Sequence, residues 1–132
     1  MRILIAEDEF TCRKVLSGLL QEYGDCDIAA NGKEAIDAFE YALQNNIPYD
    51  LVSLDIMMPQ LNGHETLDQI RKLEQEYKIT VPVKIIMTTP LNDSDNIRKA
   101  FISQCEAYLI KPIHKQDLIH QLHVLGLISH SS

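Results

Sequence analysis

The sequence has little of what membrane-spanning, secreted or nucleic-acid-binding proteins need. Its apolar runs fall well short of the roughly 20 residues that a membrane-spanning helix requires. The start turns acidic at residues 7–9, without the long apolar stretch and small-residue cleavage site of a secretory signal. Basic residues number 12 against 19 acidic ones, a net charge of −7, which argues against a surface dedicated to nucleic acid or anionic lipid. We expect a cytoplasmic protein with no direct nucleic-acid or membrane partner.

Cysteines and phosphate-binding glycine loops are also scarce. Cys12, Cys26 and Cys105 are odd in number and widely spaced, so they indicate neither a disulfide framework nor a zinc site. We expect them to be small buried apolar residues in a reducing compartment. The sequence has no Gly-x-x-x-x-Gly-Lys-[Ser/Thr] or Gly-x-Gly-x-x-Gly run, so nucleotide-dependent chemistry has no phosphate cradle.

The 132 residues, 45% of them hydrophobic and 23% charged, suit one globular domain. Short apolar runs predict strands at residues 3–6, 26–30, 51–54, 83–87 and 107–110, and a stretch of helical period follows each of them. The fourth helix would follow the polar cap candidates at residues 92–95. Strands and helices that alternate in this way predict an α/β fold, a doubly wound parallel sheet with helices on both faces.

Reactive side chains stand where these strands end. They are two acids after the first strand, one acid after the third, two hydroxyls at the fourth and an amine after the fifth: Glu7 and Asp8, Asp55, Thr88 and Thr89, and Lys111. Taken singly, an acid after a strand is usually a turn former or a helix cap, and a lone lysine is usually a solvated surface residue. In a doubly wound sheet, however, the carboxyl ends of the strands form the ligand-binding edge. Four such endings on one edge therefore predict a site.

The chemistry of these side chains predicts a Mg²⁺-dependent phosphoryl site. Clustered carboxylates repel one another and stay ionised only if a cation compensates them, and all-oxygen ligands suit Mg²⁺ better than zinc or copper. A carboxylate there can act as a nucleophile toward a phosphoryl group and form an acyl phosphate. Lys111, with the hydroxyl of Thr88 or Thr89, would bind the remaining phosphoryl oxygens.

From Arg2 to about Leu125 the sequence resembles the receiver domain of two-component response regulators. The most specific segment, residues 55–63 (Asp-Ile-Met-Met-Pro-Gln-Leu-Asn-Gly), is similar to the family's Asp-x-x-Met-Pro-x-x-x-Gly phosphoacceptor loop. The acid pair before it and the Thr and Lys-Pro after it complete the pattern. The resemblance implies a flavodoxin-like strand order, 2-1-3-4-5. It also implies a receiver domain at residues 1–126, with a short tail at 127–132 and no output domain.

The resemblance also implies a role for each residue of the site. Asp55 would accept a phosphoryl group from a phosphohistidine on a histidine kinase or histidine phosphotransfer protein. Asp8 would ligate Mg²⁺ directly, Glu7 would act mainly through water, and Met57 would contribute its backbone carbonyl. A spacing of 22 residues before Lys111 selects Thr89 over Thr88 as the switch hydroxyl. Tyr108 resembles the switch aromatic, and Pro112 resembles the cis proline that aims the phosphoryl-binding amine.

In the family, the output surface comprises helix four, strand five and helix five, here roughly residues 93–104, 106–110 and 114–125. We expect a downstream partner to contact Leu109, Ile113 and the exposed sides of Asn96, Lys99 and Ser103. The chain would then be a stand-alone response regulator, a phosphoacceptor signalling domain rather than a conventional enzyme. Two alternatives stay open: a phosphorelay intermediate or phosphate sink, and an interaction module regulated without phosphorylation. Whether phosphorylation produces a homodimer also stays open.

Other site classes fit the residues less well. A phosphatase of the haloacid dehalogenase type resembles Asp-x-Asp, and here the second position is Met57. In a flavin-binding protein, the acids after the first strand would repel the flavin phosphate. His114, His120 and His123 are more consistent with surface histidines than with a metal patch, because an i, i+3 pair supplies only two ligands.

Three positions depart from the family pattern. Pro90 follows the switch threonine and lacks a backbone N–H, and Gln104 stands where a left-handed glycine is usual. The segment Lys72–Val81 is a few residues longer than in chemotaxis-type members, which should lengthen the third helix or its following loop, away from the active edge. Met57 and Leu91 would flank the phosphoryl group with apolar side chains, and we expect them to hinder attack by water and prolong the acyl phosphate.

Overall fold

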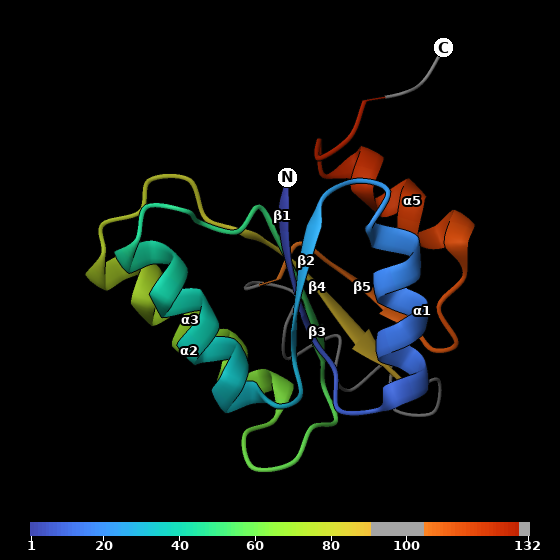
Figure 1. Cartoon of the computed structure of the whole chain (residues 1–132), viewed down its shortest axis with the longest axis horizontal. Helices are drawn as coiled ribbons and strands as arrows, with labels where there is room; N and C mark the ends of the chain where they lie inside the picture. Colours follow the sequence, from blue (N-terminus) through green and yellow to red (C-terminus); the bar gives the residue numbers. More distant parts are fainter. Residues whose placement is uncertain (91–104, 130–132) are drawn as a thin grey trace.

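The computed structural model describes residues 1–90 and 105–129, which build one five-stranded parallel sheet with strand order β2-β1-β3-β4-β5. Its elements are β1 (Arg2–Ala6), α1 (Phe10–Leu20), β2 (Asp25–Ala29), α2 (Gly32–Gln44), β3 (Leu51–Asp55), α3 (Gly63–Glu76), β4 (Lys84–Thr89), β5 (Ala107–Ile110) and α5 (Lys115–Val124). The helices α1 and α5 cover one face of the sheet, and α2 and α3 cover the other (Figure 1). The predicted fold class and strand order are confirmed.

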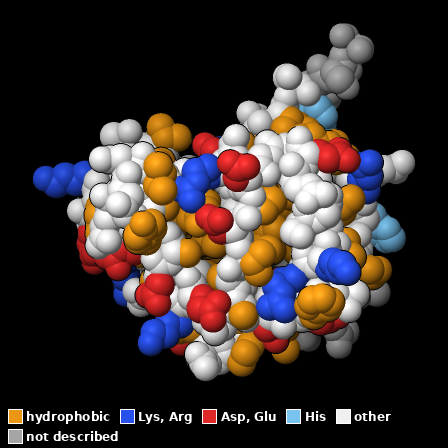
Figure 2. Space-filling view, viewed as in Figure 1, with side chains coloured by type: hydrophobic (Ala, Val, Ile, Leu, Met, Phe, Trp, Pro, Cys, Tyr) orange, Lys and Arg blue, Asp and Glu red, His pale blue; other side chains and the backbone are white. Residues whose placement is uncertain are grey.

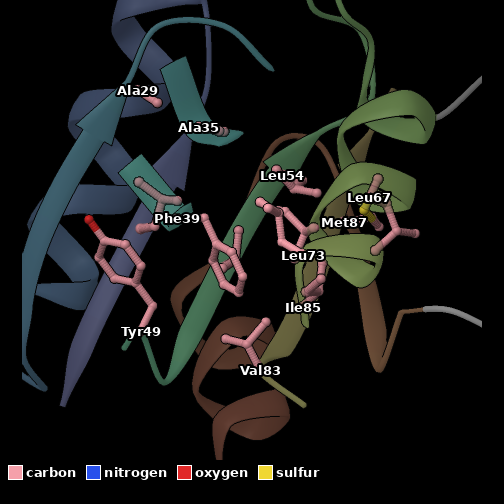
Figure 3. Close-up of a cluster of buried hydrophobic side chains, with 14 of the residues drawn as sticks. Ala29, Ala35, Phe39, Tyr49, Leu54, Leu67, Leu73, Val83, Ile85 and Met87 are labelled. Carbon is pink, nitrogen blue, oxygen red and sulfur yellow. The ribbon is translucent and has the colours of Figure 1, made fainter. Parts of the chain in front are cut away.

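Side chains of alternate strand residues form a hydrophobic core on each face of the sheet. Ile3 and Ile5 of β1 pack with Leu16 of α1 and Leu118 of α5 on one face. On the opposite face, shown in Figure 3, the larger cluster joins β3 and β4 to α2 and α3 through buried residues that include Phe39, Leu54, Leu67 and Ile85. Because both faces are covered, apolar residues make up most of the central strands β1, β3 and β4, as in other buried parallel strands.

Local sequence signals start two of the helices. The Asn31 side chain accepts a hydrogen bond from the Glu34 N–H at 2.9 Å and caps α2. Asn62 and Glu65 form a capping box at the start of α3, because each side chain accepts a hydrogen bond from the other residue's N–H. The second cap matters for the site because α3 follows the loop after Asp55.

Several expectations need correction or lie outside the described residues. Leu109, expected on an exposed partner surface, is only 7% exposed and belongs to the core cluster beneath α1 and α5, because its position in β5 turns it inward. The three cysteines are partly exposed rather than buried, since none occupies a central strand. The predicted helix after residue 92 lies outside the described residues, as do Leu91, Asn96, Lys99, Ser103 and Gln104.

The segment after α3 takes the form of an extended loop. The helix ends at Glu76 and β4 begins at Lys84, so the extra length predicted for residues 72–81 falls partly in the connection. Ile79 and Val81 of this loop are exposed. Among the described residues, no helix is both long and apolar enough to cross a membrane.

Candidate functional site

The carboxyl ends of β1 and β3 bring three carboxylates together. One oxygen from each of Glu7, Asp8 and Asp55 lies within 4.8 Å of the others. Glu7 is fully buried and Asp55 is 2% exposed, whereas Asp8 reaches solvent. In the described parts of the chain no other group of acids, histidines or cysteines assembles in this way, so His114, His120 and His123 form no such cluster.

Lys111 joins the two buried carboxylates. Its Nζ lies 3.0 Å from Oε1 of Glu7 and 3.3 Å from Oδ2 of Asp55. The lysine follows β5, and its backbone N–H donates to the Thr89 carbonyl at 2.8 Å, which extends the ladder between β4 and β5 beyond the strand. The peptide bond to Pro112 is cis, as the sequence predicts. One ammonium therefore compensates two carboxylates that would otherwise be buried without a cation.

Burial shifts the protonation of these groups. Desolvation, reinforced by the neighbouring Glu7, raises the pKa of Asp55 to about 8 despite the opposing charge of Lys111. Burial alone would lower the pKa of Lys111, but Glu7 and Asp55 outweigh that effect and raise it. At neutral pH this raised pKa favours the protonated form of Asp55, and a bound cation would favour its ionised form. Desolvation also raises the pKa of the nearby Cys12 thiol, which keeps it protonated.

The loop after Asp55 is closely packed against the start of α3. The Met57 N–H donates to Oδ1 of Asp55 at 3.2 Å, and the Gly63 N–H donates to the Ile56 carbonyl at 3.0 Å. A Cβ at position 63 would lie 2.7 Å from the Ile56 Cα and 2.8 Å from the Asp55 carbonyl oxygen, so only glycine fits. The glycine of the sequence motif therefore lets the helix approach the backbone that carries Asp55.

The two threonines of β4 differ in their position relative to Asp55. Thr88 is the Cα partner of Asp55 in the β3–β4 pair, so both residues point to the same sheet face. Thr89, one residue later, points to the opposite face and pairs with Ile110. Both threonines are 1% exposed. Thr88 Oγ1 donates to the Leu54 carbonyl at 3.5 Å, and Thr89 Oγ1 donates to the Pro90 carbonyl at 3.3 Å.

The other predicted site residues surround this centre. Tyr108 is half-buried, pairs with Met87 and packs against the core cluster beneath α2 and α3. Met57 exposes 58% of its surface, so an apolar side chain does stand beside the acidic cluster. Sequence reasoning missed the full burial of Glu7 and its shared contact with Lys111, because residues 104 positions apart carry no local signal of proximity.

The donor set suits Mg²⁺. The three carboxylates offer only oxygen, the ligand type that this cation prefers. Oε1 of Glu7 is buried and, although close to Lys111, accepts no hydrogen bond from a described residue. A cation would satisfy that atom, and the exposed Asp8 leaves one side of the site open to water and to a phosphoryl oxygen. The residues present therefore fit the metal that the sequence predicts.

Comparisons with known proteins agree with this geometry. Residues 3–123 match the model of the response regulator receiver domain. The regulatory protein VanRB of Enterococcus faecalis is 31% identical over 123 residues, which cover 93% of this chain and 50% of VanRB. The chain spans only 12% of a probable histidine kinase 2 of Oryza sativa, with 27% identity. The chain thus spans half of these curated relatives' length or less.

Solved structures show the same likeness. One comes from the complex of the Saccharomyces cerevisiae histidine phosphotransfer protein Ypd1 with the receiver domain of Ssk1. The match to this structure has a TM-score of 0.79 and 26% identity, and it covers 97% of this chain and 92% of the matched chain. Another is the receiver domain of the sensor histidine kinase PA1611 of Pseudomonas aeruginosa, with a magnesium ion in its active site cleft: TM-score 0.75, 25% identity, covering 93% and 94%. With the family model matched along nearly its whole length, this chain belongs to the response regulator receiver domain family.

Proposed function

We propose that the chain accepts a phosphoryl group on Asp55, from the phosphohistidine of a histidine kinase or histidine phosphotransfer protein, in a Mg²⁺-dependent reaction. The observation that carries the proposal is the buried Asp55 carboxylate, which lies within 4.8 Å of Glu7 and Asp8 oxygens and 3.3 Å from the Lys111 ammonium. The Ypd1–Ssk1 complex supports a phosphotransfer partner, since its chain shares this fold. The phosphorylated chain then signals by binding another protein.

The reaction is a displacement at phosphorus. A carboxylate oxygen of Asp55 forms the new O–P bond, the N–P bond to the donor imidazole breaks, and the imidazole takes up a proton as it leaves. Mg²⁺, held by Glu7, Asp8, Asp55 and the backbone carbonyl of Met57, would supply positive charge to the phosphoryl oxygens. Asp55 must be ionised to attack, and the positive charge that a bound Mg²⁺ would supply beside it would favour the ionised form.

Lys111 and Thr89 bind the product. The Lys111 ammonium, which now contacts Glu7 and Asp55, would bind a phosphoryl oxygen, and the Thr89 hydroxyl would turn from the Pro90 carbonyl to a second one. Movement of Thr89 would leave space for Tyr108 to turn inward. The change would reach the surface of β5 and α5, where a downstream protein would bind.

A relay or phosphate-sink role is the second candidate. Curated relatives include histidine kinases of which this chain spans about one eighth, so receiver domains like this one also occur inside kinases. In that role the acyl phosphate would pass from Asp55 to another histidine, and no downstream binding would depend on it.

Incubation with acetyl phosphate or phosphoramidate and Mg²⁺ tests the primary step. We expect one phosphoryl mass addition that is lost in Asp55→Asn and kept in Asp37→Asn, a matched change at an exposed aspartate of α2. Addition to Asp55→Asn at the wild-type level would contradict the assignment. A pull-down that compares phosphorylated and unphosphorylated protein, with Lys111→Ala as the uncoupled variant, separates the regulator from the relay.

A further inference from the structure

A cavity of about 290 Å³ lies at the amino-terminal edge of the sheet, the edge opposite Asp55. The loop before β3, the loop before β4 and the segment after α5 line it. Figure 1 shows the first two loops side by side, at the opposite end of the sheet from the loops that follow β1 and β3. We call this cavity the amino-edge pocket, and the lining residues that define it are Tyr49, Asp50, Ile79, Val81, Lys84 and Leu127. None of them takes part in the site proposed for phosphoryl transfer.

Exposed apolar side chains line part of the pocket. Val81 is 75% exposed and Ile79 is 37% exposed, and the neighbouring Ile47 is 43% exposed. Figure 2 shows hydrophobic side chains at the surface on the side of the molecule where these loops lie. Ile79 and Val81 belong to the segment, residues 72–81, that is predicted from the sequence to be longer than in chemotaxis-type members. Exposed apolar side chains that line a cavity are available to an apolar side chain of a partner, and prolines at 48 and 82 restrict the two loops that carry them.

The rim of the pocket carries two opposite charges that do not pair with each other. Among the described residues no ion pair joins Lys84 or Asp50 to another side chain. Oδ2 of Asp50 accepts the Arg2 backbone N–H at 2.8 Å, and no described residue donates a hydrogen bond to Oδ1. The same patch thus contains a protruding valine, a cavity that can receive one, an ammonium and a carboxylate.

We propose that the amino-edge pocket binds the same surface of a second copy of this chain. A two-fold interface needs a self-complementary patch, in which each feature meets its complement from the partner. Val81 of each protomer enters the pocket of the other, and Lys84 of each pairs with Asp50 of the other. A partner of a single charge sign would satisfy only one of the two rim charges.

The predicted dimer is weak and independent of phosphorylation. The patch has fewer residues than the roughly 20–30 a side of a standard interface, so it belongs to the low-affinity class. The pocket lies at the opposite edge of the sheet from Asp55, so both acceptor sites of the dimer face outward and stay accessible to a donor. The inference goes beyond the proposed function and does not depend on it.

Sedimentation equilibrium of the full chain, from micromolar to millimolar protein, tests the proposal with and without Mg²⁺ and acetyl phosphate. We expect a concentration-dependent dimer whose affinity is the same in both conditions. Val81→Asp should weaken it at least about tenfold, because a carboxylate would be buried in an apolar pocket. Val124→Asp, an equally simple change at a 63% exposed valine of α5, should leave it unchanged.

Charge reversal provides the second arm. Lys84→Glu should weaken self-association, and a mixture of Lys84→Glu with Asp50→Lys should restore a mixed dimer. Circular dichroism confirms that each variant is folded, and the mixture keeps the test decisive even if Asp50→Lys alone is less stable. A wild-type chain that stays monomeric at millimolar concentration, a dimer that forms only with acetyl phosphate, or one that Val124→Asp abolishes and Val81→Asp spares, would overturn the proposal.

Discussion

The Lys111 ammonium lies 3.3 Å from the Asp55 carboxylate, and the two residues come from neighbouring regions of the sheet edge that are 56 positions apart in the sequence. The same ammonium lies 3.0 Å from Glu7. The Lys111 ammonium therefore contacts two of the acids, Glu7 and Asp55, that are proposed to bind Mg²⁺. This contact matters for both stability and function. The Lys111 ammonium compensates the charge of Glu7 and Asp55 before phosphorylation, and the same ammonium is proposed to bind the phosphoryl group.

Replacing Lys111 should affect stability and signalling differently. Lys111→Met leaves Glu7 and Asp55 without their ammonium, and we expect the free energy of unfolding to fall by about 2 kcal/mol in the absence of metal. Saturating Mg²⁺ should restore much of this loss, because the metal supplies the missing charge. Urea unfolding with and without Mg²⁺ measures both effects. Lys115→Met, at an exposed position of α5, is the control; equal losses in both variants would contradict the prediction.

Gly63 should tolerate no side chain. Gly63→Ala places a Cβ 2.7 Å from the Ile56 Cα and 2.8 Å from the Asp55 carbonyl oxygen, so α3 and the phosphoacceptor loop must separate. We expect a loss of about 2 kcal/mol in unfolding free energy and slower phosphorylation by acetyl phosphate.

The matched change for that test is Gly18→Ala. A Cβ at Gly18 of α1 would have no neighbour within 4 Å, so alanine should stabilise the protein by about 0.5–1 kcal/mol through its higher helix propensity. Shifts of the thermal midpoint in the same direction for Gly63→Ala and Gly18→Ala would contradict the predicted steric conflict at Gly63.

Tyr49 should make stability depend on pH in the alkaline range. Burial, together with a hydrogen bond from its hydroxyl to Asp27 at 2.6 Å, raises the pKa of Tyr49 from 10.0 to about 12. The folded state therefore keeps a proton that the unfolded state loses, so this contribution is complete below pH 10 and is lost as the pH rises toward 12. Tyr49→Phe should remove that part of the pH slope and cost about 1 kcal/mol at neutral pH.

Chemical denaturation across that pH range, with Tyr41→Phe as the control, measures the Tyr49 effect. Tyr41 lies on α2 and is 62% exposed, so its replacement should leave the slope unchanged. A slope that survives in Tyr49→Phe at its wild-type size would assign the alkaline transition to another group.

A single fluorescent reporter can distinguish the roles of the two threonines of β4, Thr88 and Thr89. The chain has no tryptophan, so Tyr108→Trp provides one fluorophore at the proposed switch position. In that background Thr89→Ala should leave the phosphoryl mass addition intact. The equilibrium constant for the inward turn of residue 108 after phosphorylation, measured from the tryptophan emission, should fall about tenfold, because one hydrogen bond to a charged group is lost. Thr88→Val is the control, because its hydroxyl donates to the Leu54 carbonyl. The reverse pattern would transfer the switch role to Thr88, the Cα partner of Asp55.

Local patterns predicted the order of the elements well. Apolar runs and helical spacing are encoded within a few neighbouring residues, so the strands that end near Asp55 and Thr89 were recognisable from the sequence. Leu109 shows where the family resemblance gave a wrong expectation. Its expected exposure came from the family's partner surface, whereas its side of β5 faces α1 and α5.

By itself, the sequence determined which chemical groups stand at the ends of the strands and that they suit Mg²⁺ and a phosphoryl group, because those properties belong to residue types and short spacings. Only the tertiary structure decided that Glu7 is fully buried, that Lys111 serves two carboxylates and that Thr88, not Thr89, shares a sheet face with Asp55. It also decided that loops around Tyr49 and Val81 form one pocket. Each of these depends on strand register and on contacts between distant segments, which no local pattern records.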